Sequence, residues 1–311
     1  MTTHGLTFRR VSLIVLLLAA CSIVAAPVGK RVDVGNGRNL HIVCMGSGLH
    51  TVVMESGAAL GFYEWWLVQS ALRDRIRTCS YDRAGFGWSD PPAGPRSVAG
   101  YIDDLHALLQ RSGEKPPFIL VGHSMGGSFV QRYYWRYPAE VAGIIAVDPA
   151  NLESSQPHLA EMEQAVAAHR ARRTKEMEEW RATGKWPKQD FPVELPADLR
   201  ARLIAESASR NWWEARFGEG ALPDLEVSMT AEQRHIAIPL VVIAAQWRRP
   251  SGWSEEAIER QRKHMLEGQK EIASRSSKSE IVSTTSGHEV PIEAPDVVVR
   301  EIEKMARIVW P

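Results

Sequence analysis

Short apolar runs rich in β-branched residues recur along the chain, and helical stretches separate most of them. Eight such runs occur, at 31–34, 40–44, 51–54, 76–81, 118–121, 143–147, 236–245 and 279–283. Strands that alternate with helices form a mostly parallel sheet, because the crossover helices cover both of its faces. The first two runs flank Gly35-Asn36-Gly37 and instead predict an antiparallel hairpin. The expected fold class is α/β, with a mostly parallel eight-stranded sheet and helices on both faces.

The character of the sequence changes at about Asn151. The segment 151–235 is rich in charges, helical in pattern and interrupted by several prolines, and the buried-strand pattern returns only after it. This segment therefore predicts a helical cap inserted into the sheet domain. The expected organisation is a leader at 1–26, a first core part at 27–150, the cap at 151–235 and a second core part at 236–311.

One apolar run leads directly into a serine that lies between two glycines. The sequence there is Phe118-Ile119-Leu120-Val121-Gly122-His123-Ser124-Met125-Gly126-Gly127, and a helical stretch follows. In a tight strand-to-helix turn the serine hydroxyl projects alone, and such close packing requires positions without side chains two residues before and two residues after it. Gly122 and Gly126 meet that requirement. The context predicts that Ser124 is a nucleophile.

A serine hydroxyl is a poor nucleophile unless a base takes its proton. That base is expected late in the chain, on a loop after the last strand. Ser286-Gly287-His288 follows the run 279–283 and precedes the final helical stretch, so His288 has the expected order and position. We therefore expect His288 to be the base for Ser124.

Three segments together resemble the α/β-hydrolase superfamily. They are Tyr81-Asp82-Arg83-Ala84-Gly85-Phe86-Gly87-Trp88-Ser89-Asp90, the serine turn 122–126 and the segment 286–288. The resemblance covers most of 31–311 and implies a hydrolase. Members that open epoxides or remove halogens use Asp as nucleophile, so Ser124 argues against both and favours transfer of an acyl group to water. The resemblance also implies a mostly structural role for Asp82 and Arg83.

The acid partner of His288 departs from the commonest pattern of the superfamily. In that pattern an Asp follows the strand that ends here at position 245, but this chain has Gln246-Trp247-Arg248-Arg249. Other members carry the acid at the end of the preceding strand, where this chain has Asp148. The resemblance thus implies Asp148, which could otherwise only cap the following turn. Glu255 and Glu256 are the alternative acids.

The oxyanion of an acyl-transfer reaction needs two preorganised donors. The resemblance implies the backbone N–H of Met125, directly after the nucleophile, and the backbone N–H of Ala58 in the loop 55–58. Many relatives have His-Gly in this loop, and here Ser56 replaces the histidine. Because the donor is a backbone group, the replacement leaves the donor itself intact but leaves the support of the loop open.

The N-terminus has the pattern of a targeting segment, since Arg9 and Arg10 precede an apolar run at 11–20. Leu18-Ala19-Ala20-Cys21 resembles a bacterial lipobox, which makes Cys21 the candidate for lipidation. Cleavage after Ala26 without lipidation is the alternative. The longer run from Val11 to Val28 is 18 residues, just long enough for a marginal membrane span. We expect an exported protein, either an envelope lipoprotein anchored through its N-terminus or a periplasmic or secreted protein.

Export bears on the two remaining cysteines, because oxidising compartments permit disulfides. Cys44 and Cys79 lie near the ends of two apolar runs that the resemblance makes neighbours, and the sequence leaves open a bridge or two buried thiols. No C-x-x-C or H-E-x-x-H spacing occurs, so neither a metal nor another cofactor is expected.

The charge balance narrows the class of partner. The chain has 37 Lys and Arg against 37 Asp and Glu, which gives no basis for expecting nucleic acid as a partner.

The expected function is cleavage of an ester, in the manner of a carboxylesterase or lipase, through an acyl-enzyme on Ser124. The alternatives are an aminopeptidase or amide hydrolase, an acyltransferase, or a catalytically silent binding module. Neither the acyl substrate nor the oligomeric state follows from the sequence.

Overall fold

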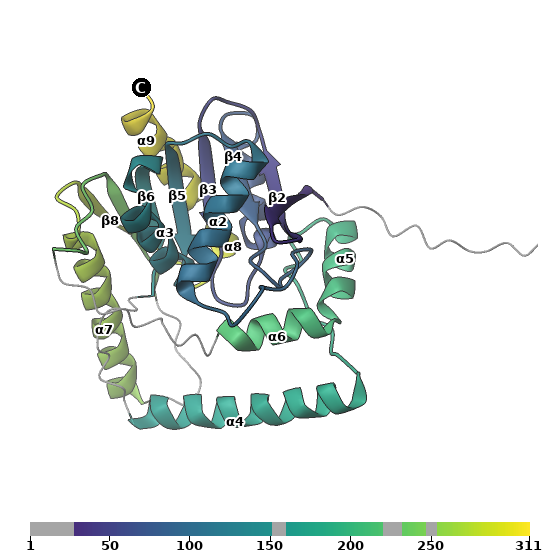
Figure 1. Ribbon diagram of the computed structural model, residues 1–311. Coiled ribbons are helices and arrows are strands. Elements are labelled where there is room, and N and C mark those ends of the chain that lie inside the picture. The colour runs from purple at the N-terminus through teal and green to yellow at the C-terminus, as the bar shows by residue number, and fades with distance from the viewer. Residues whose placement is uncertain (1–27, 151–159, 220–231, 247–253) are drawn as a thin grey trace, which may run out of the picture.

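The computed structural model describes residues 28–150, 160–219, 232–246 and 254–311 (Figure 1). The predicted leader with Cys21 therefore lies outside the described residues, as do Trp247, Arg248 and Arg249 of the loop without an acid. Within the described part of the chain, no helix has the length and apolarity needed to cross a membrane.

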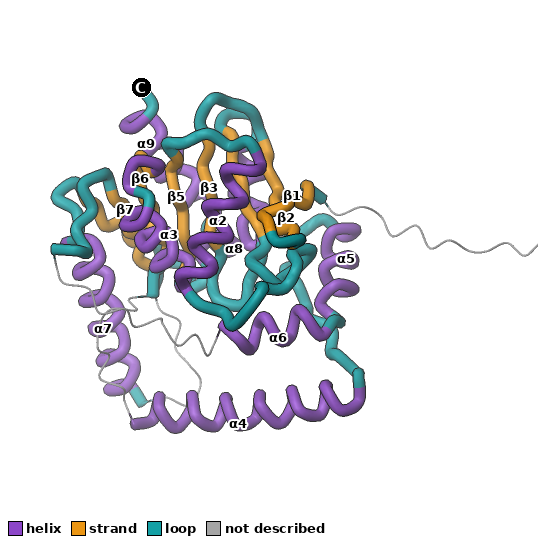
Figure 2. The backbone as a smooth tube through the Cα atoms, in the orientation of Figure 1, coloured by secondary structure: helices purple, strands orange, loops and turns teal. Residues whose placement is uncertain are grey.

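One sheet of eight strands forms the centre of the molecule, in the order β1-β2-β4-β3-β5-β6-β7-β8 (Figure 2). The pairs β1–β2 and β2–β4 are antiparallel, and every other neighbouring pair is parallel. This arrangement confirms the predicted fold class. The strands are β1 (Lys30–Gly35), β2 (Arg38–Met45), β3 (Thr51–Glu55), β4 (Arg77–Tyr81), β5 (Phe118–His123), β6 (Val141–Val147), β7 (Leu240–Ala244) and β8 (Ser279–Ser283).

Helices cover both faces of this sheet, as predicted. Side chains from α2 (Val98–Ser112), α3 (Met125–Arg136) and α7 (Glu255–Ser274) form one buried cluster with the strands. Side chains from α1 (Trp66–Leu72) and α9 (Pro295–Val309) form a second cluster on the opposite face. Because both faces are covered, the central strands β3, β5 and β7 are buried at every position rather than at alternate ones. The remaining core helices are η1 (Phe62–Trp65), η2 (Pro138–Glu140) and α8 (Val290–Glu293).

The described residues between β6 and β7 contain three helices, α4 (Ala160–Thr183), α5 (Ala197–Ser207) and α6 (Arg210–Glu219). In Figure 1, α5 and α6 lie next to the sheet domain, and α4 runs farther from it. Aromatic side chains join these helices to the core. Trp180 of α4 and Trp213 of α6 have ring centroids 4.7 Å apart, and Trp212 of α6 lies 5.8 Å from Phe86 of the core. One buried cluster contains Met177 of α4, Leu199 of α5 and Trp212 of α6 together with Phe62 and Tyr63 of η1. The three helices therefore pack on the η1 side of the core.

Strand β2 forms a hairpin with β1 and is joined to β4 by a disulfide. Gly35, Asn36 and Gly37 have φ values of 98°, 55° and 70°, a left-handed turn that glycine and asparagine adopt most easily. Cys44 of β2 lies directly opposite Cys79 of β4, and a disulfide joins them. The bridge is one of the two outcomes that the sequence left open.

Candidate active site

Ser124 lies in the turn between the end of β5 and the start of α3. Its φ and ψ are 52° and −119°, a conformation that non-glycine residues rarely adopt. Backbone hydrogen bonds hold it there. The Ser124 N–H donates to the carbonyl of Val147 at 2.9 Å, and the Ser124 carbonyl accepts from the N–H groups of Gly127 and Ala150 at 3.0 Å each. The end of β6 thus supports the strained turn.

The two glycines around Ser124 are required by close packing. A Cβ atom on Gly122 would lie 2.3 Å from the carbonyl oxygen of Gly126. A Cβ atom on Gly126 would lie 2.5 Å from the carbonyl oxygens of Glu55 and Ser56. All three obstacles are backbone atoms, which cannot move aside as a side chain would.

Ser124, His288 and Asp148 form a continuous chain of hydrogen bonds at the carboxyl ends of the parallel strands. The Nε2 atom of His288 lies 3.0 Å from Oγ of Ser124, and its Nδ1 atom lies 2.6 Å from Oδ2 of Asp148. The imidazole is 41% exposed, so a substrate can reach it, whereas the carboxylate of Asp148 is 1% exposed. The structure therefore brings together the three residues selected from the sequence.

The carboxylate of Asp148 is fixed by further bonds. Its Oδ1 atom accepts from Nε2 of Gln269 at 2.7 Å and from the N–H of Ala245 at 3.3 Å. Its own N–H donates to the carbonyl of Ile243 at 2.7 Å, so this residue sits between β6, β7 and α7. The alternative acids Glu255 and Glu256 lie exposed in the first turn of α7. It is Asp148 that reaches His288.

The two predicted oxyanion donors, Met125 and Ala58, lie in two different segments, directly after Ser124 and in the loop after β3. Met125 is the first residue of α3, and the N–H groups of a first helical turn have no partner within their helix. In the loop after β3, the N–H of Gly57 donates to Glu64 at 2.9 Å and the N–H of Ala59 donates to Glu219 at 2.6 Å. The amide of Ala58 lies between these two occupied amides, and Ala58 itself is exposed.

His123 connects the turn at Ser124 to the loop of His288. Its Nδ1 atom forms a buried ion pair with Glu64, and its Nε2 atom donates to the carbonyl of His288 at 2.7 Å. Burial alone would lower the pKa of this imidazole, but the charge and hydrogen bond of Glu64, together with Glu289, outweigh burial and raise the pKa to about 9. Neither contact of His123 follows from a local sequence pattern, because Glu64 and His288 are distant along the chain.

Arg83 is the centre of a buried ion network behind the loop after β3. Its guanidinium donates to the carboxylates of Glu55 and Glu219, with distances of 2.6 Å from Nη1 and 2.6 Å from Nε. Burial alone would lower the pKa of Arg83, but these carboxylates more than offset burial and hold the pKa well above its usual range. Burial also raises the pKa of Glu55. Sequence patterns pointed to Arg83 but not to Glu219, which is one of many charged residues in its segment.

Two groups of side chains among the described residues bring three possible metal ligands within 4.8 Å of one another. In the group of Cys44, Cys79 and Glu114, the two sulfur atoms are bonded to each other. In the group of Glu64, His123 and Glu289, the imidazole and Glu64 already form an ion pair. Both groups therefore have ligand atoms that are engaged within the protein.

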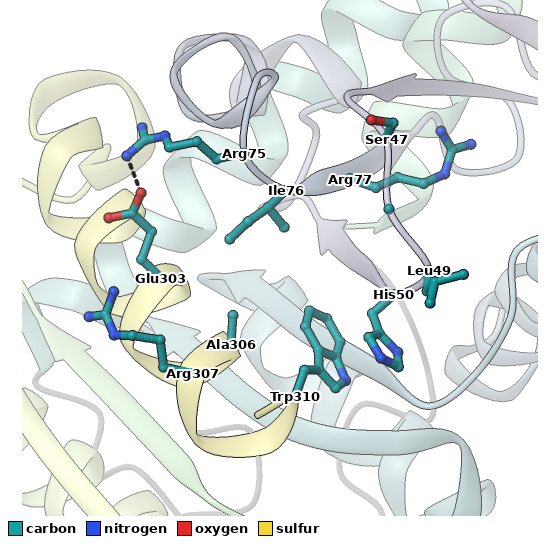
Figure 3. Close-up of a pocket in the computed structure, with 11 residues that line it drawn as sticks. Ser47, Leu49, His50, Arg75, Ile76, Arg77, Glu303, Ala306, Arg307 and Trp310 are labelled. Carbon is teal, nitrogen blue, oxygen red and sulfur yellow. Dashed lines mark hydrogen bonds and ion pairs between the residues drawn. The ribbon is translucent and has the colours of Figure 1, made fainter.

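A surface pocket of about 430 Å³ lies near the amino ends of the parallel strands, at the end of the sheet opposite to Ser124 (Figure 3). It is lined by residues that precede β3 and β4 and by the end of α9, where the rings of His50 and Trp310 stack at 4.8 Å. The amino ends of the parallel strands lie near this pocket, and their carboxyl ends lie near Ser124. The pocket is therefore separate from the candidate active site.

An α/β sheet with a serine turn at its centre, and with histidine and aspartate after later strands, defines a class of hydrolases. A model of the alpha/beta hydrolase fold matches residues 50–247. The chain belongs to this family, which confirms the resemblance seen in the sequence.

Curated relatives are similar over part of the chain. YbdG of Bacillus subtilis, an uncharacterized protein, is 34% identical over 124 residues, which cover 39% of this chain and 37% of YbdG. A (lyso)-N-acylphosphatidylethanolamine lipase of Mus musculus is 36% identical over 101 residues, covering 32% of this chain and 30% of the lipase. The match thus spans less than two fifths of the length of either relative.

Solved structures match over nearly the whole chain. A thermophilic esterase from Thermogutta terrifontis superposes with a TM-score of 0.61 at 20% identity, covering 91% of this chain and 99% of the esterase. At this identity the similarity establishes the fold.

Proposed function

We propose that this protein is a serine esterase that forms an acyl-enzyme on Ser124. The observation that carries the proposal is the unbroken hydrogen-bonded chain from Ser124 through His288 to the buried carboxylate of Asp148. The strained backbone of Ser124 supports it further, since such strain accumulates at functional sites. The names of an esterase and a lipase among the similar proteins favour an ester as the substrate.

In the proposed reaction, Oγ of Ser124 attacks the carbonyl carbon of the ester while Nε2 of His288 takes the hydroxyl proton. The carbonyl electrons move to the oxygen, which accepts hydrogen bonds from the N–H groups of Met125 and Ala58. His288 then gives the proton to the alcohol oxygen as the carbon–oxygen bond breaks. Water attacks the acyl-enzyme by the same steps and releases the acid.

Asp148 has an orienting role in this mechanism. Its Oδ2 atom accepts from the Nδ1 of His288, which leaves Nε2 free to accept the serine proton. The bonds from Gln269 and Ala245 hold the other carboxylate oxygen, so the acceptor cannot rotate away. The negative charge of Asp148 also stabilises the imidazolium that forms during the attack.

A fluorophosphonate probe tests the proposal on the full chain. We expect a stoichiometric adduct on Ser124, identified by mass spectrometry, and a labelling rate at least about 100-fold lower in His288→Ala, since a general base contributes that much or more. A panel of acyl esters and the matching anilides then separates ester from amide cleavage. Absence of an adduct on folded protein would refute a serine hydrolase, and faster cleavage of the anilides would refute an esterase.

We also propose export, with lipidation at Cys21. The disulfide between Cys44 and Cys79 supports this, because such bridges form mainly in oxidising compartments. Metabolic labelling with palmitate should mark the wild-type chain and fail to mark Cys21→Ala. Equal labelling of both would contradict lipidation at that residue.

A further inference from the structure

The loop after β3 contains a residue in the left-handed region that is not glycine. Ala59 has a φ of 62°, which an L-residue with a Cβ atom adopts only when its surroundings impose it. Both polar backbone groups of Ala59 are held by α6. Its N–H donates to Oε2 of Glu219 at 2.6 Å, and its carbonyl accepts from Nη1 of Arg216 at 3.0 Å. In Figure 1, α6 lies against the loops of the sheet domain.

Glu219 is itself fixed from the core side. Its side chain is 1% exposed, and Nε and Nη2 of Arg83 donate to its two oxygens at 2.6 and 3.0 Å. The same guanidinium donates to the carbonyl of Ser56 at 2.8 Å and to the carbonyl of Gly57 at 2.6 Å. The Arg83–Glu219 pair therefore holds three backbone groups of the loop, the carbonyls of Ser56 and Gly57 and the N–H of Ala59. Arg216 holds a fourth, the carbonyl of Ala59.

These contacts fix the two peptide planes on either side of Ala58. The carbonyl of Gly57 and the N–H of Ala58 belong to one trans peptide and point in opposite directions. Because the Gly57 carbonyl points at Arg83, the Ala58 N–H points away from the guanidinium. The next peptide is held through the Ala59 N–H by Glu219. The direction of the Ala58 N–H is thus set by a residue of the core and a residue of α6.

We propose that Glu219 and Arg216 are positioning residues that aim the Ala58 N–H at the oxyanion, so that the site is competent only while α6 is docked on this loop. The inference rests on the proposed function. A positioning role and a purely structural role of these residues predict different effects of a substitution. Loss of a structural contact lowers the fraction of protein that is folded. Loss of a positioning contact lowers the rate constant of every folded molecule, because the transition state is stabilised less.

Two variants of the full chain test the inference, Arg216→Met and Glu219→Gln. The matched controls are Arg210→Met and Glu214→Gln, which remove an exposed ion pair from the same helix. Each protein is titrated with fluorophosphonate so that rates are expressed per reactive Ser124. On a small activated ester, we expect kcat of the test variants to fall by about 10- to 100-fold, with KM nearly unchanged. This loss is smaller than the loss from removing an oxyanion donor entirely, because the Ala58 N–H is misdirected but still present. The controls should keep the wild-type kcat.

A transition-state analogue supplies the second readout. A trifluoromethyl ketone adds to the serine and places an oxyanion between the donors, so its Ki should rise by the same factor as kcat/KM falls. Unchanged kcat per titrated serine, or a fall in kcat with an unchanged Ki, would overturn the inference. If Glu219→Gln fails to fold, Arg216→Met decides the question alone. A wild-type protein without labelling or esterase activity would instead overturn the proposed function, and the inference with it.

Discussion

The buried ion pair between His123 and Glu64 should make the stability of the fold depend on pH above neutrality. Both side chains are fully buried, with exposures of 1% and 0%. The pKa of His123 is about 9 against an ordinary value of 6.5, although burial opposes this, because Glu64 stabilises the imidazolium. At pH 7 the ring is therefore doubly protonated in the folded protein. His123→Gln removes the titrating ring while keeping a polar side chain.

The sign and size of the effect follow from the shift. A folded-state pKa above the unfolded value means that the folded state binds the proton more tightly, so the stabilisation is complete below about pH 6.5 and disappears as the pH rises through about 9. A shift from 6.5 to about 9 corresponds to about 3 kcal/mol of unfolding free energy, at roughly 1.4 kcal/mol for each unit.

Urea denaturation of wild type and His123→Gln at about pH 6 and about pH 9.5 measures this quantity. Other titrating groups contribute to both proteins and cancel in the difference. We expect the variant to be less stable than wild type at the lower pH by about 3 kcal/mol more than at the higher pH. An equal gap at the two pH values would refute an imidazolium at position 123.

Three other predictions concern the turn at Ser124, its acid and the disulfide. Asp148→Asn should lower kcat on an activated ester by about 10⁴-fold with an unchanged circular dichroism spectrum, because the amide favours the wrong tautomer of the base; wild-type turnover would move the acid role elsewhere. Replacing Cys44 and Cys79 together by Ser opens a loop with a sequence separation of 35 and should cost about 4 kcal/mol in urea denaturation; an unchanged midpoint would contradict the bridge. Gly122→Ala should abolish fluorophosphonate labelling, since its Cβ would lie 2.3 Å from a backbone oxygen, while Gly94→Ala, with nothing within 4 Å, should label normally.

The parts of the fold that the sequence predicted are those fixed by local patterns. Helix α2 is bounded by such patterns. The Ser97 hydroxyl before its first residue accepts a hydrogen bond from the N–H of Gly100, and Gly113 after its last residue adopts a φ of 89°. The run 236–245 shows the limit of such patterns. There β7 begins only at Leu240, after Pro239, which has no N–H to donate to a neighbouring strand.

In the candidate site, too, some residues could be predicted from local sequence patterns and others could not. Ser124 and His288 have local signatures, a serine between glycines and a histidine on the loop after the last strand. Glu64 and Glu219 have none, because each is defined by a buried partner that lies far away in the sequence. Within α6, Glu214 is as acidic as Glu219, yet it forms exposed pairs with Arg181 and Arg210. Only the packing of the helix on the core distinguishes the two carboxylates.

Glu64 and Glu219 support the loop in which Ser56 replaces the histidine of many relatives. Glu64 accepts from the N–H of Gly57 and Glu219 accepts from the N–H of Ala59, so the amide of Ala58 is flanked by two fixed neighbours. In the proposed reaction, a buried carboxylate near this loop would oppose formation of the oxyanion. Here each is paired with a buried cation, Glu64 with His123 and Glu219 with Arg83, and the pairing offsets that repulsion. The backbone N–H groups of the loop thus gain fixed side-chain acceptors without placing unpaired negative charge next to the candidate site.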